Sequence, residues 1–204
     1  MLETKNGIVN IFGRDINLRT HNCSLFGNEG VPLKNLGINL LLRTKFCNSK
    51  CDFCIYHSDA RNWNWDRFHE VMNEMSSKIP IKKISISGGE PTLYWDNFTK
   101  ISEECRKYSP NCEMTITTNG YKFDRFMKSD IVKLYDYIQL SRHHYDDDLN
   151  NKIFKSKTPS TKEIIEYSKH RNSKNQFQIR CNLMNGYIDS KEEVFKFLDW
   201  VGKI

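Results

Sequence analysis

Three cysteines within one short stretch are the strongest candidates for chemistry in this chain of 204 residues. Cys47, Cys51 and Cys54 have the spacing CxxxCxxC, so one loop could place their thiolates around a single metal centre. A structural zinc ion takes four closed protein ligands, and no partner pair of cysteines or histidines follows at zinc-site spacing. An iron–sulfur cube can use three cysteines and leave one iron open. The spacing therefore predicts a metal centre with one position left for a ligand that is not protein.

Strands and helices alternate along the chain, after a small hairpin or entry strand expected at residues 8–20. We expect five further strands at 36–44, 83–87, 113–118, 137–141 and 177–184, helices at 66–77, 95–108, 123–129, 161–170 and 190–201, and an irregular to helical segment at 146–154. This alternation predicts an α/β fold with a parallel sheet and right-handed crossovers. The strand at 36–44 is a nearly continuous apolar run, which favours burial on both faces.

Each unusual segment of the sequence follows one of these expected strands. The cysteine loop comes after the first, residues 88–91 (Gly-Gly-Glu-Pro) after the second, 117–120 (Thr-Thr-Asn-Gly) after the third and 141–144 (Ser-Arg-His-His) after the fourth. The C-terminal ends of parallel strands share one edge of a sheet, and sites are built there. The four segments therefore predict one composite site.

Composition bounds the class of protein. Hydrophobic residues make up 38% and charged residues 27% of the chain, which is typical of one globular domain of this length. No apolar run is long enough for a membrane span, and the first residues lack the pattern of a signal peptide, so we expect a cytoplasmic protein. The net charge of +6 is spread along the chain, which does not support nucleic-acid binding.

The segments together resemble the radical S-adenosylmethionine (SAM) superfamily. The cysteine spacing with an aromatic residue before the third cysteine, the Gly-Gly-Glu-Pro element and the Thr-Thr-Asn-Gly element occur in the order of that family, and they are closest to its molybdenum-cofactor cyclases and peptide-modifying enzymes. The resemblance implies a partial, open-sided (βα)6 barrel at residues 36–204, preceded by a hairpin and loop at 1–35. Only five strands follow the hairpin, so we expect the last strand to be missing or replaced at the edge by the hairpin.

The resemblance also implies a reaction and the residues that serve it. Cys47, Cys51 and Cys54 would hold a 4Fe–4S cluster whose fourth iron binds SAM. The residues expected to contact the cofactor are Phe53, Gly88, Gly89, Glu90, Pro91, Thr117, Asn119, Ser141 and Arg180. A flavodoxin- or ferredoxin-like reductant would supply one electron, SAM would be cleaved to a 5′-deoxyadenosyl radical, and the radical would take hydrogen from a small-molecule, nucleotide or peptide substrate.

Several interpretations stay open. Arg142 and His143 could contact substrate or SAM, or they could belong to a solvated turn with the aspartates at 146–148, as we expect for His144. Arg180, which shares a strand face with Asn182, could bind a carboxylate of SAM or substrate or form a structural ion pair. Tyr56 with His57, and Trp63 with Trp65, have both a binding and a packing interpretation. Two other classes compete with the enzyme, a non-catalytic iron–sulfur protein for electron transfer or redox sensing, and a zinc-binding nucleic-acid module.

Overall fold

The computed structural model describes residues 8–17, 36–42, 47–54, 63–169 and 175–204. In chain order the elements are β1 Ile8–Ile11, β2 Arg14–Asn17, β3 Leu36–Leu42, α1 Trp65–Lys78, β4 Ile81–Gly88, η2 Pro91–Leu93, α2 Trp95–Tyr108, β5 Glu113–Thr118, α3 Phe123–Lys128, η3 Asp130–Leu134, β6 Tyr137–Ser141, α4 Asp147–Phe154, α5 Thr161–Lys169, β7 Gln176–Arg180 and α6 Lys191–Val201, where η marks a 3₁₀ helix. None of the helices in these ranges is both long and apolar enough to cross a membrane.

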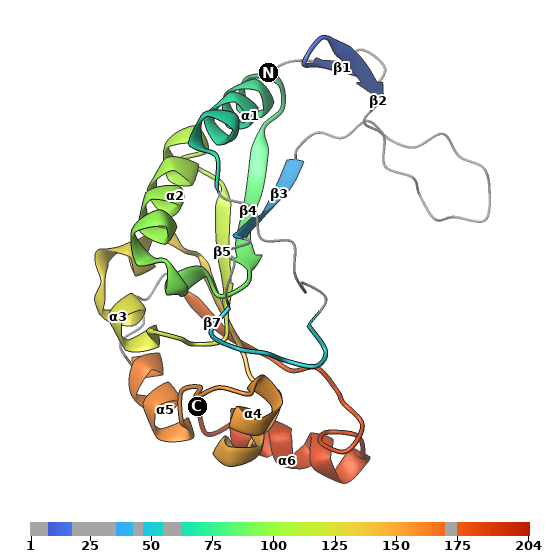
Figure 1. Ribbon diagram of the computed structural model, residues 1–204, viewed down its shortest axis with the longest axis vertical. Coiled ribbons are helices and arrows are strands. Elements are labelled where there is room, and N and C mark those ends of the chain that lie inside the picture. Colours follow the sequence, from blue (N-terminus) through green and yellow to red (C-terminus); the bar gives the residue numbers. More distant parts are fainter. Residues whose placement is uncertain (1–7, 18–35, 43–46, 55–62, 170–174) are drawn as a thin grey trace, which may run out of the picture.

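Five strands form one parallel sheet in the order β3-β4-β5-β6-β7, and β1 and β2 form a separate antiparallel hairpin. Helices α1, α2 and α3 lie along one side of the sheet, while α4 and α6 lie at the end where the strands finish (Figure 1). The sheet is open rather than closed into a barrel, which confirms the expected α/β fold. The described residues contain no sixth parallel strand.

The main core fills the space between the sheet and helices α1 to α3. Alternate residues of the strands point to the helices, because successive side chains of a strand face opposite sides of a sheet. The buried strand residues of this core include Ile84, Ile86, Met114, Ile116 and Ile138. A second cluster, with Leu140, Ile164 and Trp200, packs α5 and α6 beside the end of β6. The other face of the sheet is left clear of these helices.

Two expectations about strands are wrong in detail. β3 is an edge strand that pairs with β4 alone in the described part of the chain. Its residues are half-buried or exposed, except Leu42, so the strand is not buried on both faces. β7 ends at Arg180, and the segment from Cys181 to Met184 continues without strand structure. Asn182 therefore does not share a strand face with Arg180.

The hairpin at the start of the chain is confirmed, with its turn at Phe12 and Gly13. Both residues have positive φ, of 50° and 75°, as the tight turn of a two-residue hairpin requires. Val9 and Ile11 are buried against Ile79, just past the end of α1, and this contact fixes the hairpin to the rest of the molecule. Residues 18–35 lie outside the described ranges, so a domain division at residue 35 stays a prediction.

Candidate metal and cofactor site

The cysteine loop is docked on the C-terminal end of α4, about a hundred residues further along the chain. The Lys50 amide donates to the Phe154 carbonyl at 3.1 Å, and the Cys51 thiol donates to the same oxygen at 3.9 Å. Ser49 Oγ and Ser156 Oγ share a hydrogen bond of 2.6 Å. Beside them Asp52 forms an exposed ion pair with Lys155. The C-terminal end of α4 thus holds the cysteine loop in a defined position.

Burial changes the acidity of two of the three thiols in the loop. The pKa of Cys51 is raised to about 12, mainly by burial and to a smaller extent by the nearby Cys47 and Cys54. Burial also raises the pKa of Cys47, although the Ser49 amide donates to its sulfur at 3.5 Å. Three cysteines in one loop match the number of protein ligands that an iron–sulfur cube with one open iron takes.

Asn119, from the Thr-Thr-Asn-Gly segment, holds the cysteine loop from the sheet side. Its Nδ2 donates to Asn48 Oδ1 at 3.0 Å and to Ser49 Oγ at 2.9 Å. Its Oδ1 accepts from the Tyr121 amide at 3.0 Å, and its own amide donates to Glu90 Oε2 at 2.8 Å. Asn119 is 7% exposed, so these protein contacts use most of its hydrogen-bonding capacity.

Replacing Asn119 with alanine is expected to loosen the loop. Two hydrogen bonds to the loop would be lost, worth about 1 kcal/mol each, so iron should leave the reconstituted protein at least about tenfold faster. Iron transfer to a coloured chelator measures this rate. Asn73→Ala, at an exposed position of α1, is the matched control. Equal release rates in the two variants would contradict the role given to Asn119.

Glu90 joins the ends of β4 and β5. Its Oε1 accepts from the Thr92 amide at 3.1 Å and from the hydroxyls of Thr92 and Thr118 at 2.7 Å each. With the bond from the Asn119 amide, the carboxylate accepts four hydrogen bonds while only 1% exposed. Burial raises the pKa of Glu90, and the same hydrogen bonds oppose that shift. Pro91 begins η2 directly after it, where its missing amide proton costs nothing.

Gly88 brings the end of β4 against the backbone of β3. Its φ is +124°, and an added Cβ would lie 2.7 Å from the Leu42 nitrogen and 2.8 Å from the Leu42 oxygen. The next residue, Gly89, donates its amide to the Leu42 oxygen at 3.3 Å. The glycine at position 88 is therefore needed for the approach of two strands, whatever ligand also lies there.

Gly88→Ala is expected to reduce the free energy of unfolding by at least about 3 kcal/mol, through backbone strain and the clash with β3 together. Chemical denaturation of the protein measures this loss. Gly186→Ala is the matched control, because Gly186 also has a positive φ of 79° but nothing within 4 Å of the added Cβ. It should cost about 1 kcal/mol. Similar losses in both variants would show that strain, and not the close approach, dominates.

Phe53 and His143 join the cysteine loop to the end of β6. The Phe53 ring stands edge-on to the His143 ring at 4.8 Å, and His143 stacks on Phe154 at 4.9 Å. Burial lowers the pKa of His143 to about 4, so its imidazole is neutral at ordinary pH. Its Nδ1 accepts from the Asn182 amide at 3.0 Å, which leaves the proton on Nε2. His143 therefore supports the ring next to Cys54 instead of lying in a solvated turn.

Arg142 is a structural residue. It is 1% exposed and donates to the carbonyls of His144 at 2.6 Å, Pro159 at 2.9 Å and Tyr145 at 3.2 Å. Its guanidinium also pairs with Asp147. Of the two interpretations of Arg142, the turn with an aspartate partner is thus correct. The residue is buried, however, and not solvated as expected.

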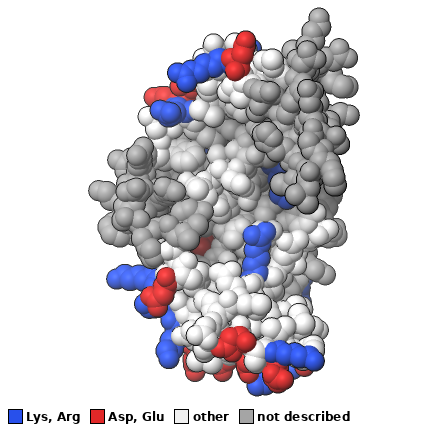
Figure 2. Space-filling model, turned by 90° about the vertical axis from the view of Figure 1, so that its right-hand side faces the viewer, with Lys and Arg blue, Asp and Glu red and all other residues white. Residues whose placement is uncertain are grey.

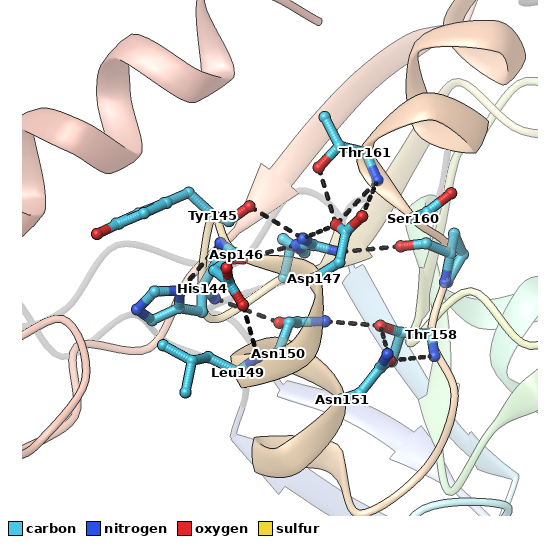
Figure 3. Close-up of polar contacts among 12 residues, drawn as sticks. His144, Tyr145, Asp146, Asp147, Leu149, Asn150, Asn151, Thr158, Ser160 and Thr161 are labelled. Atoms are coloured by element: carbon cyan, nitrogen blue, oxygen red, sulfur yellow. Dashed lines mark hydrogen bonds and ion pairs between the residues drawn. The ribbon is translucent and has the colours of Figure 1, made fainter.

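The turn after Arg142 is held by side chains of α4 (Figure 3). Asn150 Oδ1 accepts from the amides of His143 at 2.8 Å and His144 at 3.2 Å. His144 Nδ1 accepts from the Asp146 amide at 3.0 Å, so His144 belongs to the turn, as expected. Asn150 is fully buried and was not singled out from the sequence, because an asparagine within a short polar helix carries no recognisable signal.

The remaining predicted residues lie around the same edge of the sheet. Thr117 donates to Gln139 Oε1 at 3.0 Å on the next strand. Ser141 and Arg180 are opposite each other at the ends of β6 and β7, and Arg180 is exposed with no carboxylate partner in the described ranges. The site therefore brings together all the predicted residues of strands β4 to β7 and the loop, while their roles towards a cofactor remain predictions.

The two remaining pairs with open interpretations are the tryptophans at 63 and 65 and the pair that follows the cysteine loop. Trp63 and Trp65 pack on Phe68 at 5.3 Å and 5.9 Å, as partly buried members of the main core, so the packing interpretation holds over a stacking platform. Tyr56 and His57 lie outside the described residues. Besides Asn150, sequence reasoning missed Phe154 and Ser156, which no motif marks.

Comparisons with known proteins agree with this arrangement. The family model of the Radical SAM superfamily matches residues 41–198. A probable GTP 3′,8-cyclase of Thermococcus kodakarensis is 29% identical over 123 residues, covering 58% of this chain and 38% of the cyclase. A putative glycyl-radical enzyme activating enzyme of Methanocaldococcus jannaschii is 27% identical over 172 residues, covering 80% of this chain and 64% of that protein. The chain thus spans less than two thirds of these relatives.

A solved structure described as native anSMEcpe with bound AdoMet has the same fold. Its TM-score is 0.57 at 18% identity, over 80% of this chain and 48% of that one. The family match covers well over half of the chain, and it includes the cysteine loop and the ends of all five parallel strands. The chain belongs to the radical SAM superfamily of enzymes.

Proposed function

We propose that the loop of Cys47, Cys51 and Cys54 holds a 4Fe–4S cluster with SAM on its open iron, and that the chain uses them for reductive cleavage of SAM. When bound, the cluster and SAM would supply the chemistry, which is one-electron reductive cleavage of SAM to methionine and a 5′-deoxyadenosyl radical that takes a hydrogen atom from the substrate. The observation that carries the proposal is a three-thiol loop fixed beside the ends of β4, β5 and β6.

The residues of the chain serve this chemistry by position and by exclusion of water. Asn119 and Ser156 fix the loop that holds the cluster, from the sheet and from α4 respectively. Phe53, packed on His143, places an apolar ring next to Cys54, and a dry, apolar neighbour lowers solvent access to a cluster. The hydrogen bond from the Ser49 amide to the Cys47 sulfur is of the kind that tunes a cluster's reduction potential.

The ends of β6 and β7 supply the polar groups that could meet SAM or substrate. Arg180 is exposed at the end of β7, and Ser141 lies opposite it on β6. A guanidinium binds a carboxylate through two parallel hydrogen bonds, so Arg180 suits the carboxylate of SAM or of a substrate. Glu90 and Asn119 would act mainly by holding the strand ends in register, because protein donors already occupy Glu90 Oε1 and most of Asn119.

One anaerobic experiment separates this function from its competitors. The protein is reconstituted with iron and sulfide, reduced with dithionite, and its electron paramagnetic resonance (EPR) spectrum is recorded before and after SAM is added. We expect a brown protein whose spectrum changes with SAM. A cluster whose spectrum is indifferent to SAM would instead favour an electron-transfer or redox-sensing protein. Zinc binding without a cluster would favour the nucleic-acid module, and either result would overturn the proposal.

A further inference from the structure

The face of the sheet turned away from α1, α2 and α3 carries polar side chains that line up across the strands. The register places Asn39, Ser85, Thr115, Tyr137 and Gln176 in one row, and Thr117, Gln139 and Gln178 in the next row towards the cysteine loop. We call the set of Ser85, Thr115, Thr117, Gln139 and Gln178 the inner face. Figure 2 views the molecule from this side, where uncharged residues in white surround a few charged ones.

Three side chains of the inner face form a hydrogen-bonded relay. The Thr117 hydroxyl donates to Gln139 Oε1 at 3.0 Å, and Gln139 Nε2 donates to Gln178 Oε1 at 2.9 Å. The relay leaves acceptor capacity on the Thr117 hydroxyl, and no described residue accepts from Gln178 Nε2. Donor capacity thus remains at Gln178 on β7 and acceptor capacity at Thr117 on β5, with β6 between them. An amide or lactam group, –CO–NH–, carries both an acceptor and a donor, so it can bond to either end of the relay.

Thr115 has a hydroxyl that the described part of the protein does not use. The residue is 1% exposed, and its Oγ1 has no hydrogen-bond partner there. An unsatisfied buried hydroxyl costs about 1–3 kcal/mol, and valine would fill the same space without that cost. The fold alone gives no reason for threonine at this position. A ligand that bonds to the hydroxyl would give one.

Charge is confined to the two ends of this face. Lys83 and Glu113 neutralise each other at 2.7 Å near the N-terminal ends of β4 and β5. Arg180 lies at the C-terminal end of β7. Between them, the described strands present only neutral side chains to this side. A charged ligand group lying there would lose its hydration without meeting a counter-charge, which is unfavourable.

We infer that the substrate places an uncharged group with an amide or lactam edge on the inner face, hydrogen-bonded to Gln178 and Thr115. The inference rests on the function proposed above, since it takes the ligand on this face to be the substrate of the radical reaction. A nucleobase and a peptide amide both carry such an edge. An anionic part of the substrate would have to lie outward, towards Arg180.

Binding of small probes to the cluster- and SAM-loaded protein tests this inference. Nicotinamide and nicotinate share a ring and differ in one group, a neutral carboxamide or a carboxylate. Saturation-transfer NMR should give a dissociation constant for nicotinamide in the millimolar range and at least about tenfold weaker binding of nicotinate. Uracil and N-acetylglycinamide, measured in the same way, tell whether a base or a peptide amide is preferred. Equal or tighter binding of nicotinate, or no binding of either probe, would overturn the inference.

Substitutions on the inner face test whether nicotinamide binds there. Gln178→Leu should weaken nicotinamide binding about tenfold, the loss of one hydrogen bond. Asn73→Leu is the control, since Asn73 is exposed on α1, which lies on the other side of the sheet. Thr115→Val should weaken binding while the melting temperature stays equal or rises, which separates binding from folding. Unchanged binding in both Gln178→Leu and Thr115→Val would contradict the inference.

The same samples separate this inference from the proposed function. The EPR change caused by SAM is recorded for the parent protein and for each variant before the probes are added. If the parent shows no change with SAM, the proposed function itself has failed. If the change is present and the probes are not discriminated, only the inference about the substrate is wrong.

Discussion

Replacing Cys51 with alanine is expected to abolish the cluster and all cleavage of SAM. Cys51 is one of three thiols in the loop, and it is the most buried of them at 8% exposure, so no outside ligand can readily take its place. The loop should stay docked on α4, because the bond from the Lys50 amide to the Phe154 carbonyl does not need the thiol. Iron and sulfide analysis after anaerobic reconstitution measures the loss, together with the absorbance of the cluster.

Cys181→Ala is the matched control for this experiment. Cys181 is also a free, partly buried cysteine, but it lies after β7 and outside the loop. The control should bind iron and sulfide as the parent does. A Cys51→Ala protein that keeps its full complement of iron, or still forms 5′-deoxyadenosine, would contradict the assignment of the loop as the cluster site.

Arg142→Ala should have the largest effect on stability, a loss of about 3–5 kcal/mol in the free energy of unfolding. The buried guanidinium bonds to three carbonyls and to Asp147, and it lies 5.0 Å from the centre of the Trp200 ring on α6. Its removal leaves those oxygens without donors and opens a cavity between β6, α4 and α6. Urea denaturation followed by circular dichroism measures the loss.

Arg142→Lys should recover little of this stability, because an ammonium cannot reach four acceptors arranged around a planar fork. Arg67→Ala, at an exposed position of α1, is the control and should change the stability by less than about 0.5 kcal/mol. If Arg142→Ala were as stable as this control while substrate turnover disappeared, the structural role of Arg142 would be wrong and a role in binding would replace it.

The pairing with Arg142 also predicts a pH dependence. Burial alone would raise the pKa of Asp147, but hydrogen bonds from Arg142 and Thr161 outweigh it and lower the pKa below the ordinary value of 3.8. A carboxyl group with a lowered pKa stabilises the fold above its unfolded pKa, and it loses this contribution as the pH falls through its folded pKa. The stability gap between the parent and Asp147→Asn should therefore narrow below about pH 4.

The parts of the fold that the sequence predicts are those with local signals. The alternation of apolar runs and amphipathic segments is enough to place five strands and the helices between them. Buried strands and helices each impose a characteristic spacing of apolar residues along the sequence. The position of the site follows as well, since parallel strands must end at one edge. The edge position of β3 does not follow, because a strand of apolar residues does not reveal how many neighbours it has.

The contacts that complete the site depend on pairs far apart in the chain. Residues 154–156 belong to an ordinary helix end, and only folding brings Phe154 and Ser156 to the cysteine loop. The two interpretations of Arg142 could not be separated from the sequence, because its burial depends on how α4, α5 and α6 close around it. The contacts of Glu90 could not be predicted from the sequence either, since its partners Thr118 and Asn119 lie on the neighbouring strand β5 and in the turn after it.

The most direct test of the central claim is the formation of 5′-deoxyadenosine by the reconstituted protein. The anaerobic protein is mixed with SAM and dithionite, and the products are measured by liquid chromatography and mass spectrometry, with Cys51→Ala alongside. We predict 5′-deoxyadenosine and methionine in equal amounts from the parent and none from the variant. A parent protein that carries a full cluster and yet leaves SAM intact would contradict the account.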